Sequence, residues 1–189
     1  MPPGPSSSPA TGASATVPPP SSAGAGLLFL REEEIRLAQD TLFFAYRHFT
    51  HAADEVLETL GLGRAHHRAL HFIGRLPGMA VSDLLAILGI TKQSLARVLT
   101  TLVDEGYVIQ ATGRADRRQR LLTLTEKGIA LERQLFERQR DVLLRAYREA
   151  GGPAVEGFRR VLRALTDDGG QAHLSAMEAA ARELRARSA

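Results

Sequence analysis

The chain has 189 residues, of which 24 are lysine or arginine and 21 are aspartate or glutamate, so its formal net charge is +3. This length favours one compact domain with tails. Cysteine is absent, which excludes disulfides, zinc-thiolate sites and redox switching by a thiol. Because the net charge is so small, a nucleic-acid site has to be recognised from where the charges lie.

The N-terminal segment differs in composition from the rest of the chain. Seven of the nine prolines precede residue 21, among Ser, Ala, Thr and Gly, so residues 1–26 are predicted to be a disordered tail. The apolar run 27–30 is expected to dock the start of the folded part. The first charged residue is Arg31, and no apolar run approaches the roughly 18 residues that span a bilayer. We therefore expect a cytoplasmic protein without a membrane partner.

The first half of the chain is predicted to be helical. Apolar residues recur at steps of three and four from Ile35 to Leu60, which indicates one long helix over about residues 31–60. Glycines at 61 and 63 end this pattern. Two shorter helices are expected over about Arg64–Arg75 and Val81–Leu88, and the second closes on Gly89.

A fourth helix and a hairpin follow. Thr91 is well placed as the N-cap of a helix whose apolar positions are Leu95, Val98, Leu99, Leu102 and Val103. Residues 107–111 and Arg120–Leu124 are typical of short strands, joined by the polar loop 112–119.

The last part of the chain is again predicted to be helical. Thr125 caps a long helix to about residue 150, and Pro153 suits the first turn of a further helix over about 153–167. Residues 167–170 are expected to form a linker, and 169–189 a tail that can be an amphipathic helix. The predicted fold is thus mainly α with a small β-hairpin, flanked by long helices.

The central segment carries the functional signal. The helix pair around Gly89 has the spacing of a helix-turn-helix, although such pairs also occur as plain packing units in all-α proteins. The second helix of the pair presents side chains able to reach base edges in a major groove, and the loop beside it carries arginines that suit phosphates and a narrow minor groove. The predicted DNA-binding residues are Lys92, Gln93, Ser94, Arg97, Thr100, Arg114, Arg117 and Arg118.

Asp116 is the exception in this basic loop, because a carboxylate repels phosphates. We interpret it as a wing-orienting residue that pairs a neighbouring arginine and leaves another arginine aimed outward. The competing interpretation is a solvated hairpin whose arginines serve solubility.

Three stretches of this sequence resemble a known family. ITKQSLARVL, LVDEGYV and DRRQRLLTLTEKG are similar to the recognition helix and wing of the MarR family of bacterial winged helix-turn-helix regulators, over about residues 27–165. The stretch GRAHHRALHFIGR is similar to the PetP-type subgroup. The resemblance implies that Arg118 enters the minor groove, that Asp116 orients the wing, and that Gln93, Ser94 and Arg97 read bases.

The resemblance also implies a homodimer. Within a winged helix domain over residues 27–168, the helices over about 31–60, 125–150 and 153–167 would form the dimer interface, and the lobe over about residues 63–124 would bind DNA. Two recognition helices would then enter successive major grooves of a pseudo-palindromic operator. The apolar stripes on the outer helices favour the same assembly, since they must be buried somewhere; a self-contained helical bundle is the alternative.

Histidines gather between residues 48 and 71. His48 and His51 are three apart and His67 and His71 four apart, so each pair can share a helical face. This spacing leaves open a metal- or haem-sensing regulator. The absence of cysteine, and of carboxylates in register with His67 and His71, favours histidines that line a cleft, so no metal or cofactor is predicted.

The family resemblance implies that such a cleft binds a small anionic or aromatic effector. The residues predicted to line it are Tyr46, Arg47, His67, Arg68 and His71, whose cationic character suits an acid. The function expected from the sequence is therefore a ligand-responsive repressor that binds double-stranded DNA.

Other classes of function have weaker support in the sequence. The sequence shows no phosphate-binding glycine loop, no HExxH and no GxSxG, so an enzyme is not expected. A winged-helix module that binds another protein, and a DNA-packaging protein indifferent to sequence, remain as alternatives. The salt dependence of binding and a preference for an inverted repeat would distinguish them from a regulator.

Overall fold

The computed structural model describes residues 30–113 and 116–188. The predicted disordered tail 1–26, the apolar residues 27–29 and the wing residue Arg114 lie outside the described residues. The chain forms two compact units, Met1–Phe43 and Phe44–Ala189, and each is described on its own.

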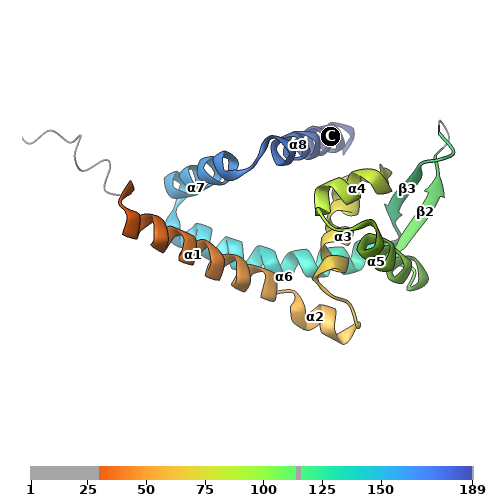
Figure 1. The fold of residues 1–189 in the computed structure, drawn as a ribbon, viewed down its shortest axis with the longest axis horizontal. Coiled ribbons are helices and arrows are strands. Elements are labelled where there is room, and N and C mark those ends of the chain that lie inside the picture. Colours follow the sequence, from red (N-terminus) through yellow and green to blue (C-terminus); the bar gives the residue numbers. More distant parts are fainter. Residues whose placement is uncertain (1–29, 114–115, 189) are drawn as a thin grey trace, which may run out of the picture. The chain divides into compact units, whose positions relative to one another are not determined.

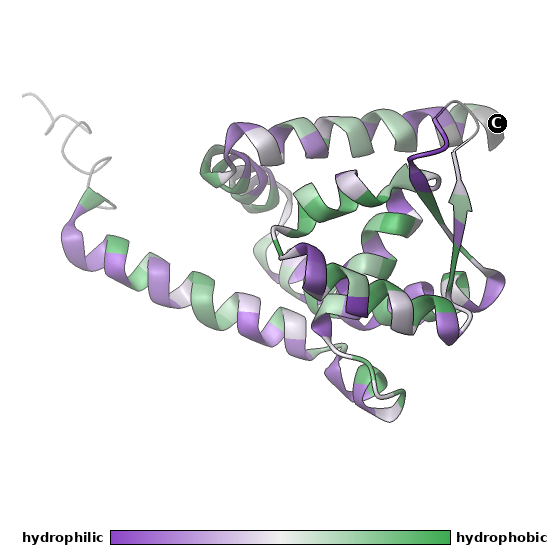
Figure 2. Cartoon of the chain, turned by 45° about the vertical axis from the view of Figure 1, so that its right-hand side comes forward, coloured by the Kyte–Doolittle hydropathy of each residue, from purple (hydrophilic) through white to green (hydrophobic). Residues whose placement is uncertain are grey.

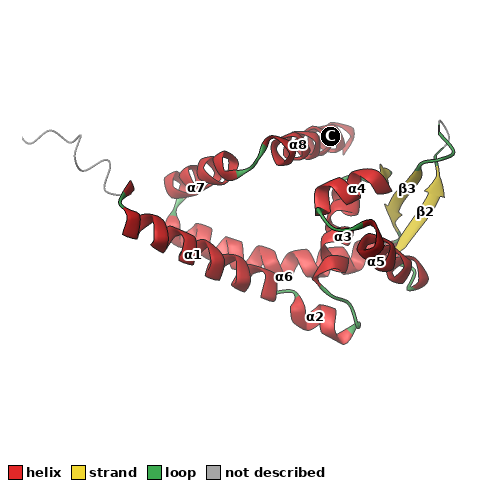
Figure 3. Ribbon diagram, viewed as in Figure 1, coloured by secondary structure: helices red, strands yellow, loops and turns green. Residues whose placement is uncertain are grey.

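The described part is mainly helical with one small sheet (Figure 1 and Figure 3). Its elements in chain order are α1 (Glu32–His51), α2 (Asp54–Thr59), α3 (Arg64–Arg75), β1 (Met79–Ala80), α4 (Val81–Leu88), α5 (Lys92–Asp104), β2 (Val108–Thr112), β3 (Arg120–Leu124), α6 (Glu126–Ala150), α7 (Gly152–Leu165) and α8 (Asp168–Ser188). Across the described residues, every helix is too short or too polar to cross a membrane.

The single helix predicted over about 31–60 is wrong, because the chain breaks it after His51. The hydroxyl of Thr50 donates to the carbonyls of Tyr46 (2.9 Å) and Arg47 (3.0 Å), a type of bond that loosens a helix. Gln139 of α6 donates to the freed carbonyl of Phe49 at 3.3 Å. The carbonyl of Phe49 at the break is therefore satisfied by a tertiary contact, which a periodic pattern does not reveal.

The core of the second unit lies around α3, α4 and α5. Its largest fully buried side chains are Leu57, Leu70, Ile73, Leu84, Leu95, Leu102, Leu122 and Leu135. Figure 2 shows that α4 is mostly hydrophobic, whereas hydrophobic and hydrophilic positions alternate along α5. A helix that supplies a core with one face keeps its other face free for contacts with a partner.

The sheet has three strands in the order β1-β3-β2, all antiparallel. The predicted hairpin is present, with Val108 opposite Leu124 and Thr112 opposite Arg120. The strand β1 was not predicted. It has only two residues, Met79 and Ala80, which pair with Leu122 and Leu121 and are too few to give a periodic signal.

The predicted linker over 167–170 is also wrong, because α8 begins at Asp168. The side chain of Asp167 accepts a hydrogen bond from the backbone N–H of Gly170 at 2.8 Å, so Asp167 acts as an N-cap. The helix predicted after it is present. It packs against α3, and its Met177 is buried.

Two helices carry apolar residues that this chain alone leaves exposed. The structure describes every residue of α7, and none of them is buried. Its large apolar side chains are between 37% and 67% exposed: Phe158, Val161, Leu162 and Leu165. In the first unit the described residues of α1 include the exposed Ile35, Leu37 and Leu42. Apolar faces of this kind are typical of surfaces that bind a partner.

Candidate nucleic-acid interface and adjoining cleft

The helix α5 has one buried apolar face and one exposed polar face, which is the arrangement that a DNA-reading helix requires. Its buried residues Leu95, Val98, Leu99 and Leu102 fix it to the core, while all five predicted contact residues on it, Lys92, Gln93, Ser94, Arg97 and Thr100, are exposed. Thr91 begins the helix by accepting a bond from the N–H of Ser94 at 3.1 Å. The hydroxyl of Thr91 also donates to Ser94 Oγ at 2.9 Å, so Ser94 takes part in the cap.

The turn before α5 gives the helix pair its angle. Gly89 follows α4 with φ of +61°, in the left-handed region that favours glycine. Only Gly89, Ile90 and Thr91 separate α4 from α5, which is the short connection of a helix-turn-helix. The two helices therefore have the local geometry that the sequence predicted.

The hairpin of β2 and β3 ends in the arginine-bearing loop (Figure 1). Arg117 and Arg118 are exposed in this loop, and neither forms an ion pair with a described residue. Below the loop, Arg120 donates to the hydroxyl of Thr112 at 2.5 Å and joins the two strands. The loop thus presents positive charge at the end of a braced hairpin.

Asp116 holds the loop through the backbone. Its Oδ1 accepts the N–H of Arg118 at 2.8 Å, and its carbonyl accepts the N–H of Gln119 at 3.0 Å. No described guanidinium contacts its carboxylate, so the predicted pairing with an arginine side chain is replaced by an Asx-type turn. As with the predicted ion pair, this turn makes the position of Arg118 depend on Asp116.

The motif LTEKG, residues 124–128, contacts the segment just after α5 from the start of α6. Thr125 caps α6 by accepting from the N–H of Gly128 at 3.0 Å, and its hydroxyl donates to the carbonyl of Gly106 at 2.7 Å. Lys127 donates to the carbonyl of Glu105 at 2.6 Å, and its ammonium lies 4.2 Å from the ring centre of Tyr107. The start of α6 is therefore bonded directly to the residues at and just after the end of α5.

A cavity of about 460 Å³ lies in the second unit between the end of α1, α3 and α6. Its lining includes four of the five predicted cleft residues, Tyr46, His67, Arg68 and His71. Arg47 is not among the lining residues; its guanidinium lies 5.0 Å from the ring centre of Phe44. The sequence did not indicate the remaining lining residues, which are Phe49, Thr50, Arg64, Phe72, Phe136, Gln139, Arg140 and Leu143.

The chemistry of this cavity is aromatic and cationic. Arg64, Arg68 and Arg140 line it together with aromatic side chains, and none of its lining residues is acidic. His67 is 8% exposed, and burial, followed by repulsion from His71, lowers the pKa of His67 below its ordinary 6.5. Glu132 of α6 lies 3.4 Å from Nδ1 of His71.

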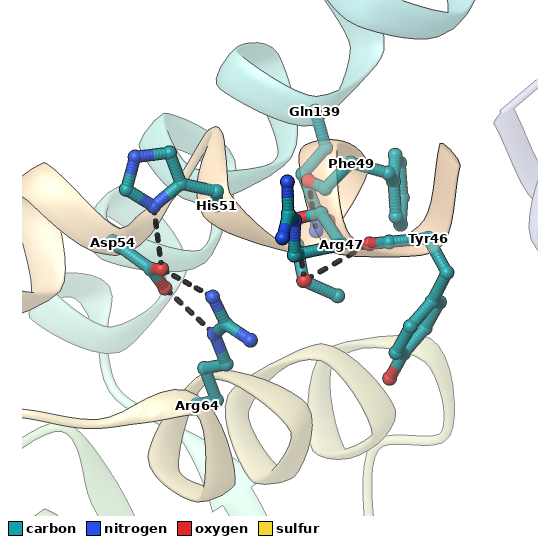
Figure 4. A network of polar contacts seen from close by, with 8 residues as sticks. Tyr46, Arg47, Phe49, His51, Asp54, Arg64 and Gln139 are labelled. Carbon is teal, nitrogen blue, oxygen red and sulfur yellow. Dashed lines mark hydrogen bonds and ion pairs between the residues drawn. The ribbon is translucent and has the colours of Figure 1, made fainter. Parts of the chain in front are cut away.

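An ion-pair network joins the end of α1 to α2 and α3, as Figure 4 shows. Arg64 donates through Nε to Oδ1 of Asp54 at 3.0 Å and through Nη2 to Oδ2 at 2.5 Å. His51 Nδ1 lies 2.9 Å from Oδ2 of the same carboxylate. The bond from Arg64 is the main reason why the pKa of Asp54 is lowered to about 2, against burial that would raise it.

The histidines do not assemble into a metal site within ranges 30–113 and 116–188, where no group of three or more ligand-type side chains is arranged to hold an ion. Three of them make other contacts. His51 contacts Asp54, His71 contacts Glu132, and Nδ1 of His66 accepts the N–H of Gly63 at 3.0 Å. Because these contacts are spread over several elements, the geometry of the described residues gives the metal- or haem-sensing alternative no support.

An exposed polar helix after a tight turn, with a basic hairpin beside it, defines a winged helix-turn-helix DNA-binding protein. The family model described as MarR family matches residues 60–119. The HTH-type transcriptional regulator PetP of Rhodobacter capsulatus is 53% identical over 150 residues, which cover 79% of this chain and 90% of that protein. The chain belongs to the MarR family of transcriptional regulators.

Solved structures agree with this fold. A MarR transcriptional regulator from Methanosarcina mazei Go1 is 25% identical, with a TM-score of 0.59 over 69% of this chain and 94% of that chain. A MarR family protein of Mycobacterium tuberculosis, solved in complex with p-aminosalicylic acid, is 24% identical, with a TM-score of 0.51 over 67% of this chain and 96% of that chain. The expected winged helix fold and family are confirmed, and the protein is a DNA-binding regulator of transcription rather than an enzyme.

Proposed function

We propose that the protein is a homodimeric repressor, acting in the cytoplasm, that binds a pseudo-palindromic operator and releases it when a small aromatic acid enters the cleft. The observation that carries this proposal is the division of α5 into a buried apolar face and an exposed face with Gln93, Ser94 and Arg97. These side chains can read base edges in a major groove, while Arg117, Arg118 and Arg114 of the wing supply contacts to phosphates and the minor groove.

The exposed apolar side chains of the outer helices support a dimer. The stripes on α1 and α7 are exposed in the part of the chain that the structure describes, and twofold pairing is the commonest way in which soluble proteins bury such surfaces. A dimer would present two copies of α5, which requires an inverted repeat in the DNA with half-sites about one helical turn apart.

The cleft supports the ligand response. Its volume falls within the usual range for small-molecule sites, and its aromatic walls and arginines suit a flat acid. The cleft lies between α3, which packs on α5, and α6, which is bonded to the end of α5 through Lys127. A ligand that favours one arrangement of these helices would shift the spacing of the two recognition helices.

Footprinting on the DNA upstream of the protein's own gene tests this function. A protected inverted repeat, lost on addition of a small aromatic acid, is the expected result. The alternatives give different results: a DNA-packaging protein would protect all sequences alike, and a protein-interaction module would bind duplex weakly or with little dependence on salt.

A further inference from the structure

Arg64 belongs to two sites at once. It lines the cleft, and both of its bonding nitrogens are engaged by the carboxylate of Asp54, which does not line the cleft. Arg68 and Arg140, the other two arginines of the cleft, form no ion pair with any described residue. One arginine of the three is therefore already neutralised from within the protein.

The partner carboxylate lies at a structural junction. Asp54 is the first residue of α2, directly after the break that follows α1, and it also contacts His51 at the end of α1. Arg64 is the first residue of α3. The Asp54–Arg64 pair thus joins the α1–α2 junction to the helix that packs against α5.

A carboxylate from a ligand would satisfy Arg64 with the same two-pronged geometry that Asp54 uses. If Arg64 moved from Asp54 to the ligand, its charge would stay paired, and Asp54 would keep His51 as a partner. The exchange would therefore leave Arg64 paired with a carboxylate and Asp54 in contact with His51. It would, however, remove the tie between the α1–α2 junction and the start of α3.

We infer that Asp54 is an internal competitor of the ligand: it occupies Arg64 in the free protein, and an acidic ligand takes Arg64 from it and so releases α3 from the α1–α2 junction. This inference rests on the ligand cleft of the proposed function. In this inference Asp54 lies outside the cleft and positions Arg64. Arg64 is the residue that responds when a ligand occupies the cleft.

The first test measures binding of p-aminosalicylate and of its uncharged carboxamide to the full-length protein by calorimetry. Asp54→Asn is expected to bind the acid roughly two- to fivefold more tightly, because an ion pair whose arginine is 48% exposed is a modest competitor. Glu55→Gln removes the same charge from the neighbouring residue, which has no described ion pair, and is expected to bind as the wild type does. The carboxamide, which carries no negative charge, should bind with the same affinity to the wild type and to both variants.

The second test needs no variant. Saturating p-aminosalicylate should speed hydrogen exchange of the backbone amides over residues 54–66 in the wild-type protein, and the free Asp54→Asn protein should show the faster exchange without ligand. Unchanged exchange in this segment would overturn the inference.

The outcomes separate this inference from the proposed function. Acid that binds equally well to wild type, Asp54→Asn and Glu55→Gln would refute the competition and leave the cleft intact as a ligand site. Equal tightening in Asp54→Asn and Glu55→Gln would also refute it, because that result is a general effect of charge. Failure of the acid to bind any variant would overturn both this inference and the ligand response, whereas duplex binding would be unaffected.

Discussion

The backbone of Gly128 lies against the carbonyl group of Tyr107. A Cβ atom on Gly128 would lie 2.1 Å from that carbonyl oxygen and 3.0 Å from its carbon. The start of α6 and the segment after the recognition helix therefore approach more closely than any side chain permits, and the glycine of the LTEKG motif has a steric explanation.

Replacing Gly128 with alanine should force these two segments apart. We expect Gly128→Ala to lower the free energy of unfolding by about 1–3 kcal/mol, measured by urea unfolding at a fixed protein concentration. Gly169→Ala in the first turn of α8 is the control, because Gly169 is exposed and its Cβ position lies 3.9 Å from Oδ1 of Asp167, an ordinary contact distance. It should retain the stability of the wild type or gain up to about 1 kcal/mol. Equal losses in the two variants would contradict the steric explanation.

Removing the guanidinium of Arg118 should weaken binding to all duplexes alike. Because Arg118 is predicted to contact the backbone and minor groove, Arg118→Ala should also reduce the slope of log affinity against log salt by about one. Fluorescence anisotropy at several salt concentrations measures both effects. Arg182→Ala, which removes an exposed arginine of α8, should change neither; a similar loss in both variants would mean that only net charge matters.

Arg97 is predicted to act on sequence preference. Arg97→Ala should lower the discrimination at one base pair of each half-site by about 1–3 kcal/mol, since a bidentate contact to a base edge would be lost. Selection of duplexes from a randomised pool measures this change. Thr101→Ala on the same helix is the control, because the hydroxyl of Thr101 donates to the carbonyl of Arg97 at 3.2 Å within the helix. An unchanged preference in Arg97→Ala would remove Arg97 from the base-reading set.

Asp116 should matter through the turn that it forms. Asp116→Ala loses the acceptor for the N–H of Arg118 and is expected to weaken duplex binding, even though it removes a negative charge from the loop. Asp116→Asn keeps an acceptor oxygen and should bind at least as tightly as the wild type. If alanine instead strengthens binding, the carboxylate acts only by repelling phosphates.

The buried His67 predicts how stability depends on pH. Its pKa is lowered from 6.5, chiefly by burial and next by His71, so the unfolded chain takes up a proton at a higher pH than the folded chain. The free energy of unfolding should therefore fall as the pH drops below about 6.5. The pKa of His66 is lowered by burial as well and adds to this fall. Urea unfolding at several pH values should show a smaller fall in His67→Gln; an identical fall would rule out His67 as a source.

The local elements of the DNA-binding half could be predicted from the sequence because their signals are local. Thr91 and the apolar spacing after it indicate the start and the buried face of α5, and both are observed. The hairpin follows from two short β-rich segments on either side of a polar loop. By contrast, the break after His51 depends on Gln139, which is far away in the sequence and reaches the carbonyl of Phe49 only in the folded protein.

The cleft could be predicted only in part for the same reason. Clustered histidines and arginines pointed to α3, which supplies His67, Arg68 and His71. Phe136, Gln139 and Arg140 come from α6, and no feature of their sequence marks the face of α6 that meets α3. Arg64 was missed because its importance comes from Asp54, and a pair of residues ten positions apart on different helices has no periodic signature.

The central claim is that two chains bind one symmetric duplex through paired α5 helices and wings. Its most direct test is the mass of the complex formed on a footprinted inverted repeat at moderate salt, measured by sedimentation, with a scrambled duplex of equal length beside it. We predict two chains on each symmetric duplex and much weaker binding to the scrambled one. A single chain on the inverted repeat, or equal binding to the two duplexes, would contradict the claim.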